Sequence, residues 1–356
     1  MKLWKLVASF AQIARPQAER AEAAGWHGIG VTDSQNLAGD AWIALAAMAA
    51  ATDRLELGTT VTNPVTRHPA VTASAAQSLV ALAGDRVCVG IGRGDSALAH
   101  LGRAPASVAL LERYVRAVRS YLAGEEVAFD ALGFSEATAP DVATLGMADT
   151  PDASRLVFRR PDAPRVPVEV ASTGPRVISA AARSADRIVF ALGAAPERLE
   201  WGMETARAAR RAAGLDPETI EYAAYVNLVA HPNVAAARAM VAGGLTTFAR
   251  FGVMHGKVNG PVDEKQRKVM ERLHSAYDMQ KHTRNDSDQA ATLTPEFIDH
   301  YSIVGPADHC VGRLKALEDI GIHKVIVIGP SAGSDREQVA IAEKTVRDGV
   351  LAAFAA

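Results

Sequence analysis

Small polar residues and glycines gather directly after several β-branched runs of the chain. Thr32–Asp33–Ser34 follows one such run, Thr60–Val61–Thr62–Asn63 follows the next, and Gly92–Arg93–Gly94–Asp95 follows a third. Hydroxyls, an amide and carboxylates at these points supply donors and acceptors for a flat polar molecule, and a carboxylate can also handle a proton. In a parallel α/β fold the carboxyl ends of the strands meet at one face, so we expect these groups to share one site.

The segment Ser172–Thr173–Gly174–Pro175–Arg176 is the best candidate for an anion site. A strand leads directly into Gly-Pro at a predicted helix start, where free N–H groups and the positive helix end favour a phosphate, and Arg176 adds a charge. The run "GIGRGDSALAHLG" has the spacing G-x-G-x-G, which is not the dinucleotide pattern G-x-G-x-x-G. The phosphate site is therefore predicted at Gly174.

Each of these clusters has a structural alternative, which the residues alone leave open. Asp33 could satisfy backbone amides in a tight loop, and the 60–63 segment could supply turn and cap residues. Asp95 could cap the segment that begins near Ser96, and His68 before Pro69 is typical of a helix start rather than of a catalyst. No set of His, Cys and carboxylates has the spacing of a metal site, and no metal is predicted.

The elements that would position these residues alternate regularly. Predicted strands are Leu3–Ala8, His27–Thr32, Leu55–Thr60, Arg86–Ile91, Val166–Ala171, Arg187–Leu192, Ile220–Val229 and His323–Ile328. Predicted helices are Pro16–Ala24, Ala41–Ala51, Pro69–Ala83, Ser107–Ala123, Pro175–Arg183, Pro196–Ala213, Val234–Val241, Ala307–Ile320 and a last one near Asp335–Ala353. Strict alternation favours parallel strands with helical crossovers, and eight units favour an α/β fold of the closed (β/α)8 TIM-barrel type.

The chain of 356 residues suits one such barrel, which needs about 250 residues, with two insertions. Residues 125–165 separate the fourth and fifth units, and residues 243–303 precede the last unit. The second stretch has its own helical pattern, roughly 264–281, followed by the polar run "HTRNDSDQ". Long insertions of this kind are usually lids, substrate loops or subunit contacts. We therefore predict a single barrel domain over residues 1–356.

Composition narrows the possible partners. A net charge of −2 gives no basic footprint for nucleic acid, and no stretch approaches the ~20 apolar residues of a membrane helix. The N-terminal "MKLWKLVASFAQIA" is better explained as a first strand than as a secretion signal. Cys88 and Cys310 are the only cysteines and fit reduced core thiols. These features predict a cytoplasmic protein that binds small molecules.

Five segments together resemble the bacterial luciferase-like superfamily of (β/α)8 barrels. They resemble most its branch that uses the deazaflavin coenzyme F420 and includes the methylenetetrahydromethanopterin reductases. The segments are "VTDSQN", "LGTTVTNPVTRHPAVTAS", "VCVGIGRGDSALAHLG", "VPVEVASTGPRVISAAARSADRIV" and "YSIVGPADHCVGRLKALEDIGIHKVIVIGP".

The resemblance implies a role for each matching position. Asp33 would lie beside the cofactor ring system, and Thr60–Val61 would form a β-bulge with a non-prolyl cis peptide behind the ring. Thr62 and Asn63 would reach the ring edge or the ribityl chain. Gly94–Asp95 would approach the cofactor from the fourth strand, and Thr173–Gly174–Pro175–Arg176 would hold the phosphate.

The predicted function is that of an F420-dependent oxidoreductase, which moves a hydride between the cofactor and a small organic substrate. Asp95 is the candidate proton donor or substrate orienter. An FMN-dependent luciferase-like monooxygenase is the alternative, and a non-catalytic barrel that binds the cofactor is a third possibility. Ser34 stands where related dehydrogenases carry His, and residues 3–10 hold no carboxylate, which argues against alcohol oxidation. The family also implies a homodimer, with the apolar Ala41–Ala51 helix partly buried.

Overall fold

Parallel strands close into a barrel in the computed structural model, which describes residues 1–133 and 135–355. In barrel order the strands of the described residues are β1 (Lys2–Val7), β2 (Gly28–Val31), β3 (Glu56–Thr62), β4 (Val87–Ile91), β7 (Val168–Ser172), β8 (Arg187–Phe190), β9 (Glu221–Ala230) and β11 (Lys324–Ile328). Pairing of β11 with β1 and of β8 with β9 closes the ring. The predicted TIM barrel is confirmed.

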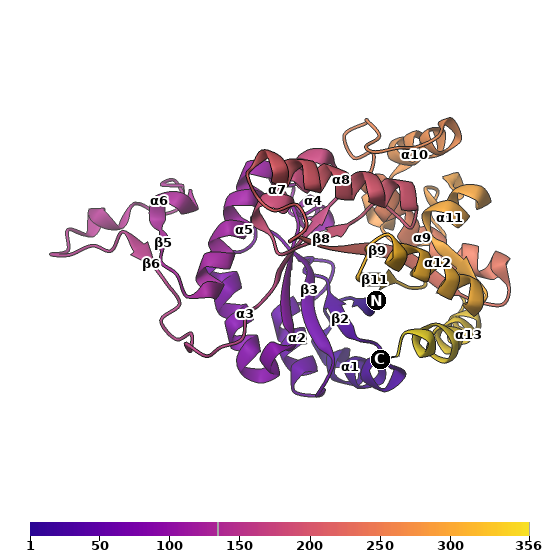
Figure 1. Cartoon of the computed structure of the whole chain (residues 1–356), viewed down its shortest axis with the longest axis horizontal. Helices are drawn as coiled ribbons and strands as arrows, with labels where there is room; N and C mark the ends of the chain where they lie inside the picture. The colour runs from indigo at the N-terminus through magenta and orange to yellow at the C-terminus, as the bar shows by residue number, and fades with distance from the viewer. Residues whose placement is uncertain (134, 356) are drawn as a thin grey trace.

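Helices surround the strands (Figure 1). They are α1 (Ala11–Ala24), α2 (Ala41–Ala49), α3 (Pro69–Ala83), α5 (Val108–Ala123), α7 (Pro175–Ser184), α8 (Pro196–Ala212), α9 (Val234–Phe251), α12 (Ala307–Asp319) and α13 (Arg336–Thr345). A π-helical turn (Val346–Val350) and a 3-10 turn (Leu351–Phe354) continue α13. Gly25 and Gly124 end α1 and α5 in the left-handed conformation, which a residue without a Cβ adopts at low cost. His68 is the N-cap of α3, as its position before Pro69 predicted.

Two helices differ from the prediction. α1 begins at Ala11, and Pro16 lies inside it. Its buried face already starts at Ala14, so burial offsets the one helical hydrogen bond that proline removes. α9 continues through Gly243 to Phe251 instead of ending at Val241. A Cβ on Gly243 would lie 2.4–2.6 Å from the backbone of residues 283–285, so this glycine permits a close chain crossing rather than ending the helix.

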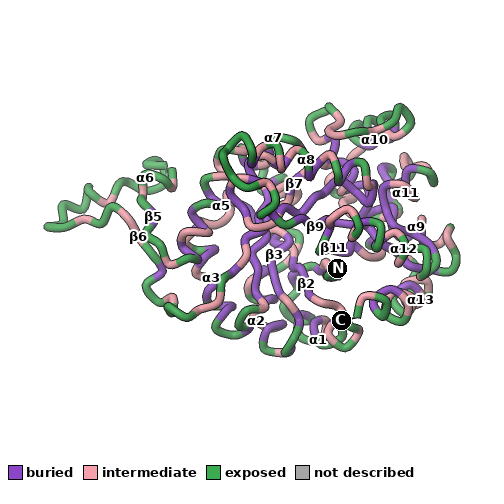
Figure 2. The backbone as a smooth tube through the Cα atoms, in the orientation of Figure 1, coloured by how far each residue is buried: buried purple, intermediate pink, exposed green. Residues whose placement is uncertain are grey.

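The predicted insertions contain short elements of their own. Residues 127–133 and 135–154 hold a small hairpin, β5 (Val127–Ala128) with β6 (Ala153–Ser154), and α6 (Phe129–Leu132), and they project from the barrel as a largely exposed arm (Figure 2). The later stretch holds α10 (Glu264–Ala276), α11 (Pro295–Tyr301) and the unpredicted strand β10 (Ile303–Gly305). β10 pairs with the last three residues of β9, beyond the point where β11 stops pairing.

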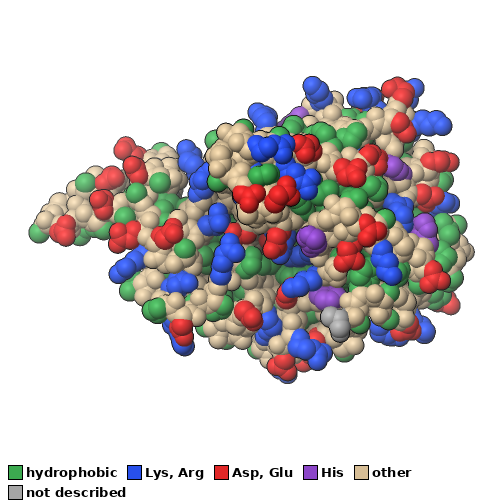
Figure 3. Space-filling view, viewed as in Figure 1, with side chains coloured by type: hydrophobic (Ala, Val, Ile, Leu, Met, Phe, Trp, Pro, Cys, Tyr) green, Lys and Arg blue, Asp and Glu red, His purple; other side chains and the backbone are tan. Residues whose placement is uncertain are grey.

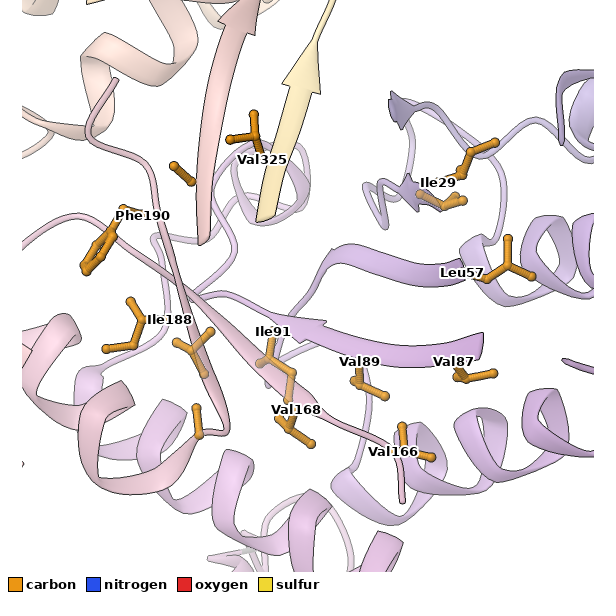
Figure 4. Close-up of a cluster of buried hydrophobic side chains, with 14 of the residues drawn as sticks. Ile29, Leu57, Val87, Val89, Ile91, Val166, Val168, Ile188, Phe190 and Val325 are labelled. Atoms are coloured by element: carbon orange, nitrogen blue, oxygen red, sulfur yellow. The ribbon is translucent and has the colours of Figure 1, made fainter. Parts of the chain in front are cut away.

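The main core lies between the strands and the helices, and alternate residues of each strand supply it. Val87, Val89 and Ile91 of β4 point into this layer, as does Val325 of β11 (Figure 4). The residues between them face the barrel interior, where Cys88 and Ile326 belong to a separate cluster. This period of two is the one expected for strands buried on both faces.

Charged side chains close the amino-terminal end of the barrel interior. Lys324 Nζ donates to both carboxylate oxygens of Glu169, at 2.8 and 3.0 Å, and lies 3.3 Å from the centre of the Trp4 ring. Arg187 also pairs with Glu169, which is 1% exposed. Burial alone would raise the pKa of Glu169, but Lys324 and Arg187 outweigh it and hold that pKa below its ordinary value. We call these three charged residues the barrel floor.

Acidic and basic side chains are interspersed over the face of the molecule drawn in Figure 3. Within the described ranges, no helix combines the length and the apolar character needed to cross a membrane.

Candidate active site

A cavity of about 760 Å³ opens at the carboxyl ends of the strands, which is the face predicted to carry the site. It is lined by the loops that follow the strands, by α9 and by residues of the 277–289 segment. Ten of the predicted positions line it: Asp33, Thr60, Val61, Asn63, Gly94, Asp95, Thr173, Gly174, Pro175 and Arg176. The strand–loop alternation thus brings these positions together from four different strand ends.

The carboxyl end of β3 is irregular at Thr60 and Val61. Its register with β4 shifts between Thr59 and Thr62, and the Thr60–Val61 peptide bond is cis. The bulge and the cis bond implied by the resemblance are therefore both present. Val61 packs against Gly92 of the next loop, where an added Cβ would lie 2.6 Å from a Val61 methyl.

At this end of β3, two buried polar atoms have no hydrogen-bond partner among the described residues: Thr60 Oγ1 and Asn63 Nδ2. Asn63 Oδ1 accepts from the backbone N–H groups of Val65 and Thr66, both at 3.0 Å. The side-chain oxygen of Asn63 therefore stabilises a turn, as its alternative structural role predicted, whereas the side-chain nitrogen does not take part. Unpaired buried polar atoms are costly. Their position at the cavity fits a bound molecule that supplies the missing partners.

Asp33 is 1% exposed and is held by side chains rather than by backbone amides. Its carboxylate accepts from Thr62 Oγ1 at 2.7 Å, from Gln35 Nε2 at 2.7 Å and from Arg67 Nε at 3.2 Å. Thr62 itself is fully buried, is not among the residues that line the cavity, and contacts Asp33, so its predicted contact with the cofactor stays a prediction.

The predicted anion site lies at the start of α7. Gly174 is the N-cap and Pro175 begins the helix, so the N–H groups of the first turn have no helical partners. Arg176 and Arg93 both line the cavity here. Burial lowers the pKa of Arg93, and the positive charge of Arg176 lowers it further. A bound anion would relieve this repulsion between like charges, so this end of the cavity suits a phosphate.

Asp95 occupies the N-cap position of the short helix α4 (Ser96–Ala99), but its side chain does not cap the helix. The carboxylate pairs instead with Arg250 of α9, and both side chains are largely buried. The structure therefore places Asp95 at the cavity as predicted, in contact with a partner that the sequence did not indicate.

Three residues in or behind the cavity lining escaped the sequence analysis: His282, which lines the cavity, and Arg250 and Tyr277, which pack behind it. The Arg250 guanidinium lies 4.4 Å from the centre of the Tyr277 ring, and Tyr277 Oη is 2.7 Å from His282 Nδ1. Burial lowers the pKa of His282 to about 4. These residues lie in or next to the second predicted insertion, which has no strand–helix alternation to indicate which side chains face the barrel. The sequence held no signal for them.

The closed barrel and the cavity at its C-terminal mouth define an α/β-barrel protein with a built ligand site. A family model described as luciferase-like monooxygenase matches residues 9–324, and the chain belongs to that family.

Its relatives include a 5,10-methylenetetrahydromethanopterin reductase of Methanolobus tindarius, 27% identical over 90% of this chain and 91% of the relative. An F420-dependent glucose-6-phosphate dehydrogenase of Beutenbergia cavernae is 33% identical over 42% of this chain and 41% of the relative. The solved structure of a coenzyme F420-dependent tetrahydromethanopterin reductase from Methanopyrus kandleri covers 99% of both chains with a TM-score of 0.74 and 19% identity, a likeness of fold.

Proposed function

We propose that this protein is an F420-dependent oxidoreductase that transfers a hydride between the deazaflavin and a small organic substrate. The observation that carries the proposal is the strand wall of the cavity, by which we mean Thr60, Val61, Asn63, Gly174 and Arg176. This wall combines two unpartnered polar atoms with a helix N-terminus and an arginine. The F420-dependent relatives of the chain support the choice of cofactor.

In this proposal each residue of the strand wall would contact one part of the deazaflavin cofactor. Thr60 Oγ1 and Asn63 Nδ2 would satisfy polar atoms of the ring system or of the ribityl chain, and the bulge at Val61 would support the ring. The start of α7, with Arg176 and Arg93, would hold the phosphate. The bound cofactor supplies the hydride chemistry, and the chain supplies binding, orientation and exclusion of water.

The opposite side of the cavity suits the apolar body of an organic substrate. Phe248, Phe251 and Met254 line it, and we call these three residues, together with Thr247 and His282, the α9 wall. A cavity of about 760 Å³ is within the range of small-molecule sites, about 300–1,000 Å³. It can hold ring and substrate next to each other.

The proposal is tested by titrating the purified protein separately with F420 and with FMN and following the fluorescence of each. We expect tight binding of F420 and weaker binding of FMN. Asn63→Leu, which removes the unpartnered amide, should weaken F420 binding, whereas Leu145→Ala on the exposed arm should not. Preferred binding of FMN, with oxygen consumption in the presence of a reductant, would instead support the monooxygenase alternative. Binding of neither molecule would overturn the proposal.

A further inference from the structure

The segment of residues 277–289, here called the strap, lines part of the cavity mouth and is held by hydrogen bonds at several points. It lies directly on Gly243 of α9, where no side chain could fit. Asn285 N donates to Ala332 O at 3.1 Å, which ties the strap to the loop after β11. The buried side chain of Gln289 accepts from Asp278 N at 2.7 Å and donates to two carbonyls of the strap at 3.3 Å. The strap can therefore hold a side chain in a defined place.

Tyr277 and His282 form a hydrogen-bonded pair on the strap. Tyr277 Oη lies 2.7 Å from His282 Nδ1 and 3.1 Å from Thr247 Oγ1 on α9. The two rings meet edge to face, with centroids 6.2 Å apart. The guanidinium of Arg250, on α9, lies over the phenol ring of Tyr277. His282 lines the cavity, and within the described part of the chain Nδ1 is the ring nitrogen that has a protein partner.

The surrounding groups favour the neutral form of both rings. Burial raises the pKa of Tyr277, so its hydroxyl keeps its proton. For His282, burial lowers the pKa to about 4; Asp95 opposes this shift, while Arg250 and His100 add to it. A neutral imidazole has one donor nitrogen and one acceptor nitrogen. An imidazole nitrogen is a better acceptor than a hydroxyl oxygen, so this contact favours the arrangement in which the phenol donates to Nδ1 and the imidazole proton lies on Nε2.

We propose that His282 donates a hydrogen bond from Nε2 to the substrate, and that Tyr277 is the positioning residue that fixes this tautomer. The proposal rests on the proposed function and adds the substrate class: uncharged compounds in which a carbonyl oxygen or imine nitrogen is conjugated with the carbon that exchanges the hydride. Arg250, the basic residue that packs on this pair, is itself paired with Asp95. The α9 wall therefore offers a neutral donor among apolar side chains rather than a free charge for a carboxylate.

The first test is nitrogen NMR of protein labelled with ¹⁵N-histidine, with the His282 signals assigned by their loss in His282→Gln. We expect the Nε2–H tautomer at neutral pH, with no titration above about pH 5. Addition of cyclohex-2-enone to the F420-loaded protein should shift the Nε2 signal, whereas cyclohexene, which has no acceptor atom, should not. In Tyr277→Phe the tautomer preference should weaken, and the shift caused by the enone should fall with it.

The second test uses kinetics of enone reduction. Tyr277→Phe should raise KM about tenfold with a smaller change in kcat, because the donor is misplaced rather than removed. His282→Leu should lose more activity than His282→Gln, whose amide can still donate. Tyr222→Phe is the matched control, since Tyr222 Oη lies on β9 without a partner among the described residues and stacks on Phe190. It should behave as the wild type.

A proton found on Nδ1, or an Nε2 signal that the enone leaves unmoved, would overturn the proposal. Equal activities of His282→Leu and His282→Gln, both close to wild type, would do the same. Failure of the proposed function is recognised separately, because it would appear as absent F420 binding while the tautomer of His282 remained as described.

Discussion

Gly174 offers a direct test of the anion site because a side chain can be added there without disturbing the fold. Its backbone, at φ −89° and ψ 156°, is extended and accessible to valine. An added Cβ would meet nothing nearer than the Asn259 side chain at 3.8 Å, an ordinary contact. We therefore expect Gly174→Val to change the free energy of unfolding of the cofactor-free protein by no more than about 0.5 kcal/mol.

The effect on binding should be much larger. A phosphate at this helix start must approach the free N–H groups of the first turn closely, and the valine methyls would stand in its path. Loss of one hydrogen bond to a charged group costs about 1.5–3 kcal/mol. This range corresponds to a rise of about 10- to 150-fold in the dissociation constant. Gly174→Ala, with one methyl group, should lie between the wild type and Gly174→Val.

The assay compares the titration of F420 with that of its phosphate-free deazaflavin core into each variant. The loss of affinity should appear for F420 and be nearly absent for the core. Gly312→Val is the control, because Gly312 is an exposed helical glycine with no neighbours near an added Cβ. If Gly174→Val weakened binding of both molecules equally, or of neither, the phosphate would be bound elsewhere and the assignment would be wrong.

Three further predictions concern the barrel floor, the Asp95 pair and self-association. Lys324→Met should destabilise the protein by roughly 3–5 kcal/mol in chemical denaturation, because it removes one partner of the buried Glu169 carboxylate. Since the pKa of Glu169 is held below its ordinary value, its stabilising contribution exists above the unfolded pKa of about 4.3 and disappears as the pH falls through the folded pKa. Asp95→Asn and Arg250→Met break the same ion pair, so the double variant should lose no more turnover than either single variant. We also propose a homodimer in which α2 is buried, because Ile43 on this helix is 62% exposed in the single chain. Light scattering at micromolar concentration should give twice the chain mass, and Ile43→Glu should lower it.

Each of these predictions has a control or a contrary result. Lys2→Met removes an exposed partner of Glu56 at the same end of the barrel and should cost less than about 1 kcal/mol. A Glu169→Gln, Lys324→Met double variant should show a weaker loss of stability in acid than the wild type. Additive losses for Asp95→Asn and Arg250→Met would indicate that Asp95 acts independently of Arg250. A monomeric mass for the wild type would contradict the dimer.

The barrel strands were predictable because each is a short apolar run between helical patterns. All eight predicted strands agree with the structure to within two residues at each end. The errors in the helix bounds arose where packing outweighed a proline or glycine that usually ends a helix. Pro16 lies inside α1 because that helix buries alanines on both sides of it, and Gly243 lies inside α9 because the strap crosses there. β10 was missed because three residues are too few to show a period.

The strand wall of the site was also predictable, because strand ends in a barrel converge on one face. The contacts around His282 of the α9 wall were not. Arg250, Tyr277 and His282 meet only because a helix and an irregular strap pack against each other, and no spacing along the chain encodes that contact. Within the predictable part, the contact of Thr62 with the Asp33 carboxylate was not indicated by the sequence.

The two walls of the cavity come from different lengths of chain. The strand wall is built before residue 177, whereas the α9 wall and the strap lie within residues 243–289. A single recombination event that exchanges this later stretch would replace the surface offered to the substrate and leave the strand wall intact. Exchange of this one contiguous stretch would therefore replace the α9 wall, whereas Asp95, the partner of Arg250, would stay on the other part of the chain.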